Sequence, residues 1–282
     1  MRLARDWLVW NKIAMPTERQ YLGRVLIIAG SDSGGGAGVQ ADIKTVTVLG
    51  GYAASAITAI TVQNTLGVTG VYPIPPDLVR AQALAVLSDI GADAIKTGML
   101  GDAATVEAVA EVLADFADIP AVIDPVMIAK GGAALLAADA LDVFRARLLP
   151  RADLLTPNAP EAEALTGLVV QDLDGQRRAG EALLRAGARA VLIKGGHVPG
   201  ERVIDLLLTG AGETLLEGPR IDTRHTHGTG CTLASASAAG LAQGSSLEAA
   251  VAQAWAFTAE AIRHAPGLGA GHGPLGHNWR LL

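Results

Sequence analysis

The sequence of 282 residues has little cysteine and few aromatic residues. Its single cysteine, Cys231, excludes an intrachain disulfide framework and fits a reducing compartment. Neither a CxxC nor an HExxH spacing occurs, so these common metal-binding motifs are absent. Because aromatic residues make up only 4% of the chain and hydrophobic residues 50%, we expect a core of Ala, Val, Leu and Ile.

Charged residues are also scarce, at 18% of the chain, and no long basic run occurs. With a net charge of −6, the protein is not expected to bind nucleic acid. Two long stretches without charge, residues 45–76 and 225–247, are interrupted by Gly, Ser and Thr. We interpret them as buried core rather than membrane spans, and expect a cytoplasmic protein without a membrane partner.

The N-terminal residues 1–24 contain basic residues but no apolar segment typical of a secretory signal. We expect them to form an extension that is poorly ordered. Residues 25–282 contain neither an internal repeat nor a linker long enough to divide domains. The sequence therefore predicts one domain over 25–282.

Short apolar runs alternate with longer amphipathic segments along this domain. Strands are predicted at 25–29, 52–60, 68–72, 94–97, 121–124, 153–156 and 190–193, and an antiparallel pair at 203–208 and 213–217. Helices are predicted at 39–49, 75–88, 102–116, 140–149, 176–186, 228–242 and 247–264, with another starting near Pro160. This alternation predicts an α/β fold with a mainly parallel sheet and helices on both faces.

Polar side chains recur where the predicted strands end. In such sheets ligands bind at the carboxyl ends of the strands, so these side chains are expected at one rim. They are Ser31, Asp32, Gln63, Asn64, Lys96, Thr97, Asp124, Asn158 and Lys194.

A glycine-rich turn at residues 226–231 runs directly into a helix of small residues. The first N–H groups of a helix lack internal partners and favour negative charge, so a transferring phosphoryl group would suit this position. Cys231 lies at the same helix start, where the pKa of a thiol tends to be lowered. The alternative is a plain helix start with an inert cysteine.

A dinucleotide-binding motif is disfavoured, and a phosphate-loop motif is absent. Residues 36–41 match GxGxx(G/A) after a strand, but no Asp or Glu occurs between 43 and 76, where a ribose-binding acid is expected. The sequence contains no Gly-Lys pair, so the GxxxxGK[ST] phosphate loop is absent. A tight strand–helix turn competes with a ligand-binding role for the glycines at 34–38.

Asn158 and Glu161 lie three residues apart at a predicted helix start, and Asp124 follows a strand. Their oxygen atoms suit Mg²⁺, but for Asn158 and Glu161 taken alone helix capping is favoured, and a simple turn explains Asp124 equally well. Lys194 could reach a nucleotide phosphate or could be a surface lysine. His225 and His227 lack a third partner in the sequence, so we reject a metal site there.

Taken together, the motifs resemble hydroxymethylpyrimidine/phosphomethylpyrimidine kinase, a family of the ribokinase-like superfamily. The resemblance rests on seven blocks in the family's order, over about residues 25–275. The blocks are 29–42, 63–65, 96–100, 124–127, 156–162, 194–197 and 226–231. The resemblance implies a three-layer α/β/α fold with a mainly parallel central sheet, and a homodimer.

The resemblance also assigns roles to individual residues. Asn158 and Glu161 match a Mg²⁺ motif, to which we add Asp124, and Lys194 and Thr226 are expected at the ATP phosphates. Residues 228–231, that is Gly228, Thr229, Gly230 and Cys231, match an anion-binding turn, with Cys231 in the position of the catalytic base. Gln63 matches the residue that hydrogen-bonds the aminopyrimidine, and Gly30, Asp42, Met99 and Val126 match the lining of its pocket.

The implied reaction is ATP-dependent, Mg²⁺-assisted phosphorylation of 4-amino-5-hydroxymethyl-2-methylpyrimidine, and then of its monophosphate, in thiamine biosynthesis. Within the enzymes, the alternative is a pyridoxal or pyridoxine kinase of the same superfamily. A non-catalytic pyrimidine-binding regulator on the same scaffold is the other alternative, although it would have no need of Asn158, Glu161, Lys194 and Cys231 together.

Overall fold

A computed structural model describes residues 23–128, 132, 135–137 and 139–281. Of the expected extension 1–24, all but Gly23 and Arg24 lie outside these residues. Arg24 is the first residue of strand β1 (Arg24–Ala29), and its guanidinium forms an ion pair with Asp93 at 2.8 Å. The folded domain therefore starts at or before Arg24.

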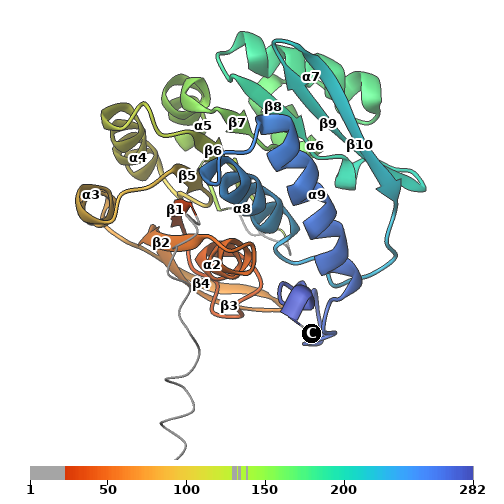
Figure 1. Ribbon diagram of the computed structural model, residues 1–282, viewed down its shortest axis with the longest axis horizontal. Coiled ribbons are helices and arrows are strands. Elements are labelled where there is room, and N and C mark those ends of the chain that lie inside the picture. Colours follow the sequence, from red (N-terminus) through yellow and green to blue (C-terminus); the bar gives the residue numbers. More distant parts are fainter. Residues whose placement is uncertain (1–22, 129–131, 133–134, 138, 282) are drawn as a thin grey trace, which may run out of the picture.

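Within the described residues, eight strands form the central sheet, in the order β10-β9-β8-β7-β6-β5-β1-β2 (Figure 1). All pairs from β8 to β2 are parallel, whereas β9 pairs antiparallel with both β8 and β10. The remaining bounds are β2 (Tyr52–Ile57), β5 (Ala94–Thr97), β6 (Ala121–Ile123), β7 (Leu154–Leu155), β8 (Ala190–Ile193), β9 (Arg202–Thr209) and β10 (Gly212–Pro219). The predicted mainly parallel sheet and the antiparallel pair are confirmed.

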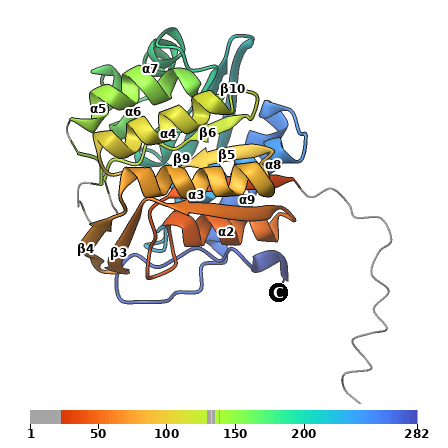
Figure 2. The same ribbon diagram turned by 90° about the vertical axis from the view of Figure 1, so that its left-hand side faces the viewer.

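Helices cover both faces of this sheet (Figures 1 and 2). One face carries α3 (Pro76–Asp89), α4 (Ala103–Asp115), α5 (Ala140–Val143), α6 (Ala159–Thr166) and α7 (Leu173–Arg185). The other carries α2 (Gly38–Val48), α8 (Thr229–Ala242) and α9 (Leu247–Arg263). The result is a three-layer α/β/α domain, as predicted.

Strand β1 shows how the sheet supplies both cores. Successive side chains of a strand point to opposite faces. Leu26 and Ile28 accordingly pack into the cluster under α3 and α4, whereas Val25 and Ile27 pack into the cluster under α2 and α8. All four are buried, because a central parallel strand has helices on both sides.

The predicted strand at 52–60 is wrong as a single element. The chain leaves the sheet at Thr58, whose N–H donates to the carbonyl of Ala29 and whose hydroxyl donates to the carbonyl of Met99 at 2.7 Å. Beyond Thr58 it continues as β3 (Ala59–Asn64), which pairs with β4 (Gly67–Pro73) in a separate two-stranded sheet. Buried alanine and β-branched residues continue across the break, so the sequence carries no signal for it.

The predicted helix at 140–149 is only partly regular. The α-helical turn of α5 passes into a π-helical turn at Phe144–Leu148 and a 3₁₀ turn at Leu149–Arg151. Phe144, Leu148 and Leu149 are all buried against the neighbouring core. The wider turn keeps these three side chains on the core side up to Pro150, where a regular helix could not continue.

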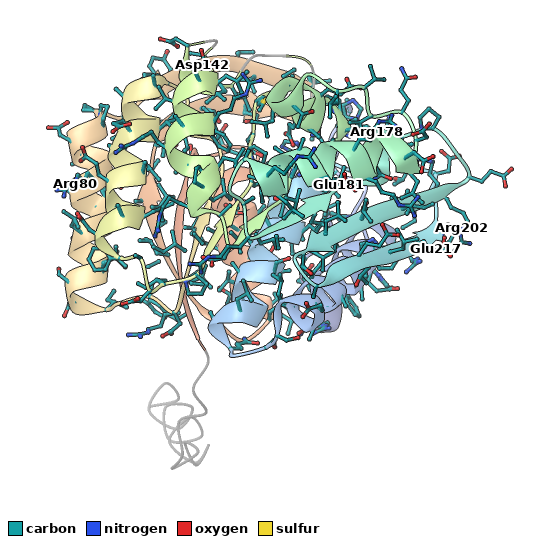
Figure 3. All side chains as sticks on the ribbon, turned by 90° about the horizontal axis from the view of Figure 1, so that it is seen from above. Arg80, Asp142, Arg178, Glu181, Arg202 and Glu217 are labelled. Carbon is teal, nitrogen blue, oxygen red and sulfur yellow. The ribbon has the colours of Figure 1, made fainter. Side chains whose placement is uncertain are left out.

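Many charged side chains lie on the outside of the domain, among them those labelled in Figure 3. Arg202 on β9 and Glu217 on β10 form an ion pair at 3.1 Å between half-exposed side chains. In the part of the chain that the structure describes, no helix combines the length and apolarity that a membrane span requires.

Candidate active site

A cavity of about 1010 Å³ lies at the carboxyl ends of the parallel strands. It lies at the predicted rim, although Asn64 and Thr97, which were expected there, do not line it. Its lining includes all of the predicted site residues except Asp42, namely Gly30, Gln63, Met99, Asp124, Val126, Asn158, Glu161, Lys194, Thr226, Gly228, Thr229, Gly230 and Cys231.

One end of the cavity, which we term the Gln63 end, begins at the loop after β1. The carboxylate of Asp32 accepts hydrogen bonds from the backbone N–H groups of Gly34 (2.8 Å), Gly36 (3.0 Å) and Ala37 (2.8 Å). His227 adds a contact at 2.8 Å. Burial opposes ionisation of Asp32, but these hydrogen bonds prevail and hold its pKa below the usual value. The glycine-rich loop is thus folded around an ionised carboxylate.

Gln63 extends from β3 into this end of the cavity. Its carboxamide lies 3.2 Å from Nε2 of His227 and 3.3 Å from the hydroxyl of Thr61. Two further lining residues, Gly30 and Met99, are in contact, since a Cβ added to Gly30 would lie 3.0 Å from the sulfur of Met99. The predicted pyrimidine-pocket residues Gln63, Gly30 and Met99 therefore share one cavity.

Asp42 was expected to line the pocket, and that expectation is wrong. It is fully buried on α2, where its carboxylate binds the ammonium of Lys96 at 2.8 and 2.9 Å and accepts from Ser235. Lys96 lines the cavity instead. Burial disfavours the charge of Lys96, yet the Asp42 carboxylate holds its pKa above the usual range. Asp42 is thus the buried counter-ion of Lys96, which itself lines the cavity.

The first turn of α8 forms the middle of the cavity wall. Gly228 caps this helix with φ +89°, and a Cβ there would lie 1.8 Å from the carbonyl oxygen of Gly36. A Cβ on Gly230 would lie 3.1 Å from Nζ of Lys194. Gly228 needs glycine because of its left-handed backbone and the clash with Gly36, whereas a Cβ on Gly230 would crowd the end of the Lys194 side chain. The N–H of Thr229 donates to the carbonyl of Thr226 at 3.3 Å, whereas the N–H groups that follow it at the helix start lack an intrahelical partner and can face an anion.

Cys231 stands half-buried in the same turn. The expected low thiol pKa is wrong: burial, together with the nearby carboxylates of Asp42 and Asp124, raises it to about 12. Lys96 and a hydrogen bond from the Gly38 backbone act in the opposite direction but do not compensate. In the protein without ligands, the thiol therefore keeps its proton at neutral pH.

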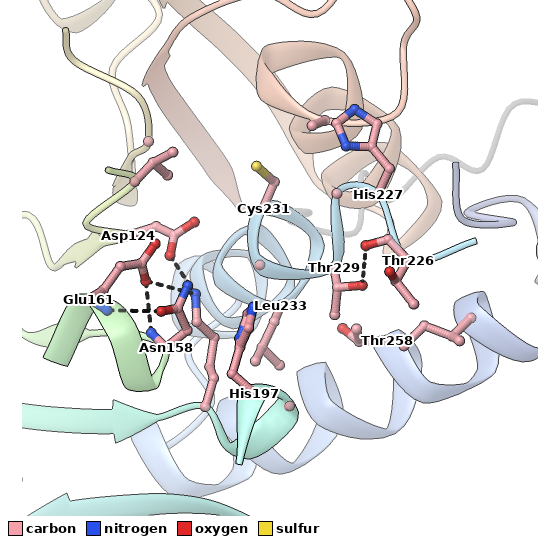
Figure 4. A pocket seen from close by; sticks show the side chains of 18 of the residues that line it. Asp124, Asn158, Glu161, His197, Thr226, His227, Thr229, Cys231, Leu233 and Thr258 are labelled. Atoms are coloured by element: carbon pink, nitrogen blue, oxygen red, sulfur yellow. Dashed lines mark hydrogen bonds and ion pairs between the residues drawn. The ribbon is translucent and has the colours of Figure 1, made fainter. Parts of the chain in front are cut away.

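At the other end, which we term the Lys194 end, one ammonium lies between two carboxylates. Nζ of Lys194 is 2.9 Å from Asp124 and 3.8 Å from Glu161 (Figure 4). Burial opposes the charge on Lys194, but the two carboxylates hold its pKa above the usual range. Burial raises the pKa of Glu161 to about 7, helped by Asp124 and opposed by Lys194. The surface-lysine alternative is therefore wrong.

Asn158 and Glu161 form the helix cap that the sequence left open as an alternative. The N–H of Glu161 donates to the amide oxygen of Asn158 at 2.9 Å, and the N–H of Asn158 donates to Glu161 Oε2 at 2.7 Å. Asn158 also lies beside Lys194 in a parallel bridge that extends β7 and β8. Both residues nevertheless line the cavity, so capping positions them there without excluding a role in binding.

The donor set fits Mg²⁺ in part. Asp124 and Glu161 offer buried carboxylate oxygens on either side of the Lys194 ammonium, and hard oxygen ligands of this kind suit Mg²⁺. The described residues contain no cluster of three or more Asp, Glu, His or Cys side chains arranged to hold a metal ion by themselves. Substrate phosphate oxygens and water would have to complete the coordination, as is usual for this ion.

The sequence placed Asp32 and Lys96 at the rim without a role of their own, and it did not indicate His227 as a binding residue. His225 and His227 were considered only as a metal pair; His227 instead contacts Asp32 and Gln63. These partners lie 195 and 164 residues away in the chain, so no local pattern could reveal them. The position of His227 directly before Gly228 was the only available signal.

The family model described as phosphomethylpyrimidine kinase matches residues 32–276. The hydroxymethylpyrimidine/phosphomethylpyrimidine kinase of Streptomyces coelicolor is 53% identical over 257 residues, covering 91% of this chain and 95% of that protein. The thiamine biosynthesis bifunctional protein ThiED of Geobacter sulfurreducens is 52% identical over 255 residues, and this chain spans about half of its length, 52%.

Solved structures agree on the fold. A pyridoxal kinase of Bacillus subtilis in complex with ADP superposes with a TM-score of 0.86 at 36% identity, covering 93% of this chain and 99% of that one. A phosphomethylpyrimidine kinase from Clostridium difficile 630 superposes with a TM-score of 0.76 at 39% identity, covering 85% and 99%. The predicted ribokinase-like fold is confirmed.

Proposed function

The chain belongs to the phosphomethylpyrimidine kinase family, and on this basis we propose that it phosphorylates 4-amino-5-hydroxymethyl-2-methylpyrimidine, and then the monophosphate, at the expense of ATP. The observation that carries the proposal is a single cavity with a carboxamide, Gln63, at one end and a buried charge cluster around Lys194 at the other. The first turn of α8 lies between them. The single cysteine fits a reducing compartment, and the proposal places the reaction in the cytoplasm.

At the Gln63 end, the pyrimidine is recognised by hydrogen bonding. A carboxamide carries both donors and acceptors, so Gln63 can pair with the ring nitrogen and the amino group of an aminopyrimidine. Gly30, Met99 and Val126 provide an apolar surface for the ring. This arrangement directs the hydroxymethyl group toward Cys231.

At the Lys194 end, the protein binds the phosphates. Phosphoryl transfer depends mainly on positioning and charge neutralisation. Lys194 and the N–H groups of residues 228–231 carry out that neutralisation, and Thr226 lies beside the turn. Asp124, Glu161 and Asn158 would hold Mg²⁺, which neutralises phosphate charge when bound.

Cys231 is the proposed acceptor of the hydroxyl proton. Its raised pKa opposes this role in the protein without ligands, but part of the shift comes from the Asp124 carboxylate. A cation that pairs with Asp124 removes that contribution and makes the thiolate more accessible. Lys96, whose charge lowers the pKa of Cys231, acts in the same direction.

A pyridoxal kinase activity is the second candidate, favoured by the TM-score of 0.86 to a pyridoxal kinase. One experiment tests both: ADP formation measured side by side with the pyrimidine alcohol, its monophosphate and pyridoxal. The highest kcat/KM is expected with the two pyrimidines. Preference for pyridoxal would reverse the order of the two candidates, and substrate binding without ADP formation would identify a regulator instead.

A homodimer is part of the proposal. The hairpin β3–β4 projects from the domain (Figure 2), and exposes Ile60 (44%), Val62 (50%) and Tyr72 (64%). Ile60 pairs with Tyr72 across the hairpin, so an apolar patch faces solvent. Because an isolated two-stranded sheet is marginally stable, a second copy of the chain is the proposed cover. Analytical ultracentrifugation tests this, and a monomer at assay concentration would contradict it.

A further inference from the structure

The carboxamide of Gln63 is held between two side chains. One of its ends lies 3.2 Å from Nε2 of His227, and the other lies 3.3 Å from Oγ1 of Thr61. The same His227 nitrogen lies 2.8 Å from Oδ2 of Asp32. His227 and Asp32 are both buried, which limits competition from water for their mutual contact.

The backbone around Gln63 is fixed as well. Its N–H donates to the hydroxyl of Ser33 at 2.8 Å, and its carbonyl accepts from the same hydroxyl at 2.7 Å. The pairing register of β3 and β4 shifts between Val62 and Gln63, a bulge of the kind that redirects a side chain. The position of the carboxamide is therefore set before any ligand binds.

The proton between Asp32 and His227 belongs to the histidine. Asp32 already accepts three backbone N–H groups, each of which needs an acceptor, and an ionised carboxylate has no hydrogen to donate. Its lowered pKa agrees with this assignment. Nε2 of His227 is consequently a donor.

A donor on His227 decides which end of the Gln63 carboxamide faces it. The amide nitrogen would place donor against donor, whereas a half-turn of the carboxamide places its oxygen there as a second acceptor, which shares the single Nε2–H with Asp32. Thr61 agrees, because its hydroxyl hydrogen is used in a 2.8 Å bond to the carbonyl of Ser31. The Thr61 oxygen can then accept from the Gln63 amide.

We propose that Asp32 and His227 form a positioning pair that fixes the Gln63 carboxamide with its oxygen toward His227, and thereby sets the order of donor and acceptor that the pyrimidine meets. One N–H and one lone pair of the carboxamide remain for the ligand. They match a ring nitrogen next to an amino group. The inference rests on the proposed function, and it adds specificity determinants from the loop after β1 and from the residue before α8.

The first test is direct and needs no turnover. In the wild-type protein with ¹⁵N-labelled histidine, the side-chain nitrogen shifts of His227 are measured by NMR and assigned by loss of the signal in His227→Gln. A protonated Nε2 is expected. An unprotonated Nε2 would make His227 an acceptor and overturn the inference, whatever the substrate proves to be.

The second test compares two substitutions of one residue. His227→Leu removes the donor, and His227→Gln keeps an N–H group at similar reach. With Leu, KM for the pyrimidine alcohol should rise about tenfold, because the carboxamide is free to turn its wrong end toward the ligand. The kcat and the KM for ATP should change much less, and Gln should restore most of the loss. Equal losses with Leu and Gln would overturn the inference.

The third test asks whether His227 acts through Gln63. In a Gln63→Ala background, His227→Leu should cause no further rise in KM, because the group that it positions is gone. Fully additive effects would show that His227 acts independently, and would overturn the proposed positioning. If the wild type turns over pyridoxal but not the pyrimidine, the proposed function fails, whereas the NMR result and the coupling measured with pyridoxal still decide this inference.

Discussion

The two ends of the cavity differ in how the charges of their buried carboxylates are balanced. At the Gln63 end, Asp32 is buried, yet its charge is balanced by backbone N–H groups and His227, so this end is complete without a ligand. At the Lys194 end, Asp124 and Glu161 share one ammonium, and the pKa of Glu161 rises to about 7 because burial disfavours its charge more than Lys194 favours it. The Gln63 end is therefore preorganised to recognise a hydrogen-bonding pattern. The Lys194 end is stabilised when further positive charge binds there.

The largest effect on activity is expected for substitution of Cys231, which lies between the two ends. Cys231→Ser should lower kcat by about 10²–10⁴-fold, the contribution typical of a general base, since a serine hydroxyl gives up its proton far less readily than a thiol. Stability should change little, because the two side chains are similar in size. Steady-state kinetics with the pyrimidine alcohol and thermal unfolding measure both quantities. A kcat near that of the wild type would leave Cys231 as a packing residue.

The raised thiol pKa gives this prediction an independent control. Alkylation of Cys231 in the protein without ligands should be slow at neutral pH and should accelerate about tenfold per pH unit, because only the thiolate reacts. The pKa of about 12 implies that no plateau occurs below that value. A rate that levels off near neutral pH would show that the helix start lowers the pKa after all.

Gln63→Leu tests the end that recognises a hydrogen-bonding pattern. The polar edge of the pyrimidine would then be buried without partners, at a cost of about 1–3 kcal/mol, which corresponds to a rise in KM of roughly 5- to 150-fold. The KM for ATP should be nearly unchanged, because Gln63 is remote from Lys194. An unchanged KM for the pyrimidine would remove Gln63 from the site.

Glu161→Gln tests the end that responds to charge. It keeps an acceptor for the N–H of Asn158, so the helix cap is preserved, but it removes one carboxylate from the proposed Mg²⁺ site. We expect kcat to fall and the Mg²⁺ concentration for half-maximal activity to rise, each about tenfold. Binding of the pyrimidine at the Gln63 end should be unaffected. Wild-type activity per folded molecule, together with lower stability, would mean that Glu161 only caps the helix.

The smallest expected effect is on the free energy of unfolding, through the ionisation of Glu161. The folded-state pKa of Glu161 is above its unfolded value of 4.5, so the folded state binds more protons and loses stability as pH rises from about 4.5 to about 7. Without Mg²⁺ and ATP, Glu161→Gln should therefore be more stable than the wild type near pH 8, by on the order of 1–3 kcal/mol, and similar to it near pH 4. Denaturant unfolding at the two pH values measures this. A variant less stable at both would contradict it.

Local patterns were sufficient to predict most of the elements of the fold. The apolar runs at β1, β5 and β8 and the antiparallel pair β9–β10 lie close to their predicted positions, because these strands are buried or alternate clearly. The division between β2 and β3 could not be predicted. It depends on hydrogen bonds from Thr58 to Ala29 and Met99, residues that approach only when the sheet has formed.

The sequence by itself determined most of the residues that reach the rim, because parallel strands bring their carboxyl ends together and the residues after them follow. Only the tertiary structure decided what those residues do to one another. It buried Asp42 under Lys96 instead of lining the pocket with it, and it raised the pKa of Cys231 by surrounding the thiol with protein and carboxylates. It also brought His227 to Asp32 and Gln63. Burial and charge pairing depend on distances between remote segments, and a linear pattern does not contain those distances.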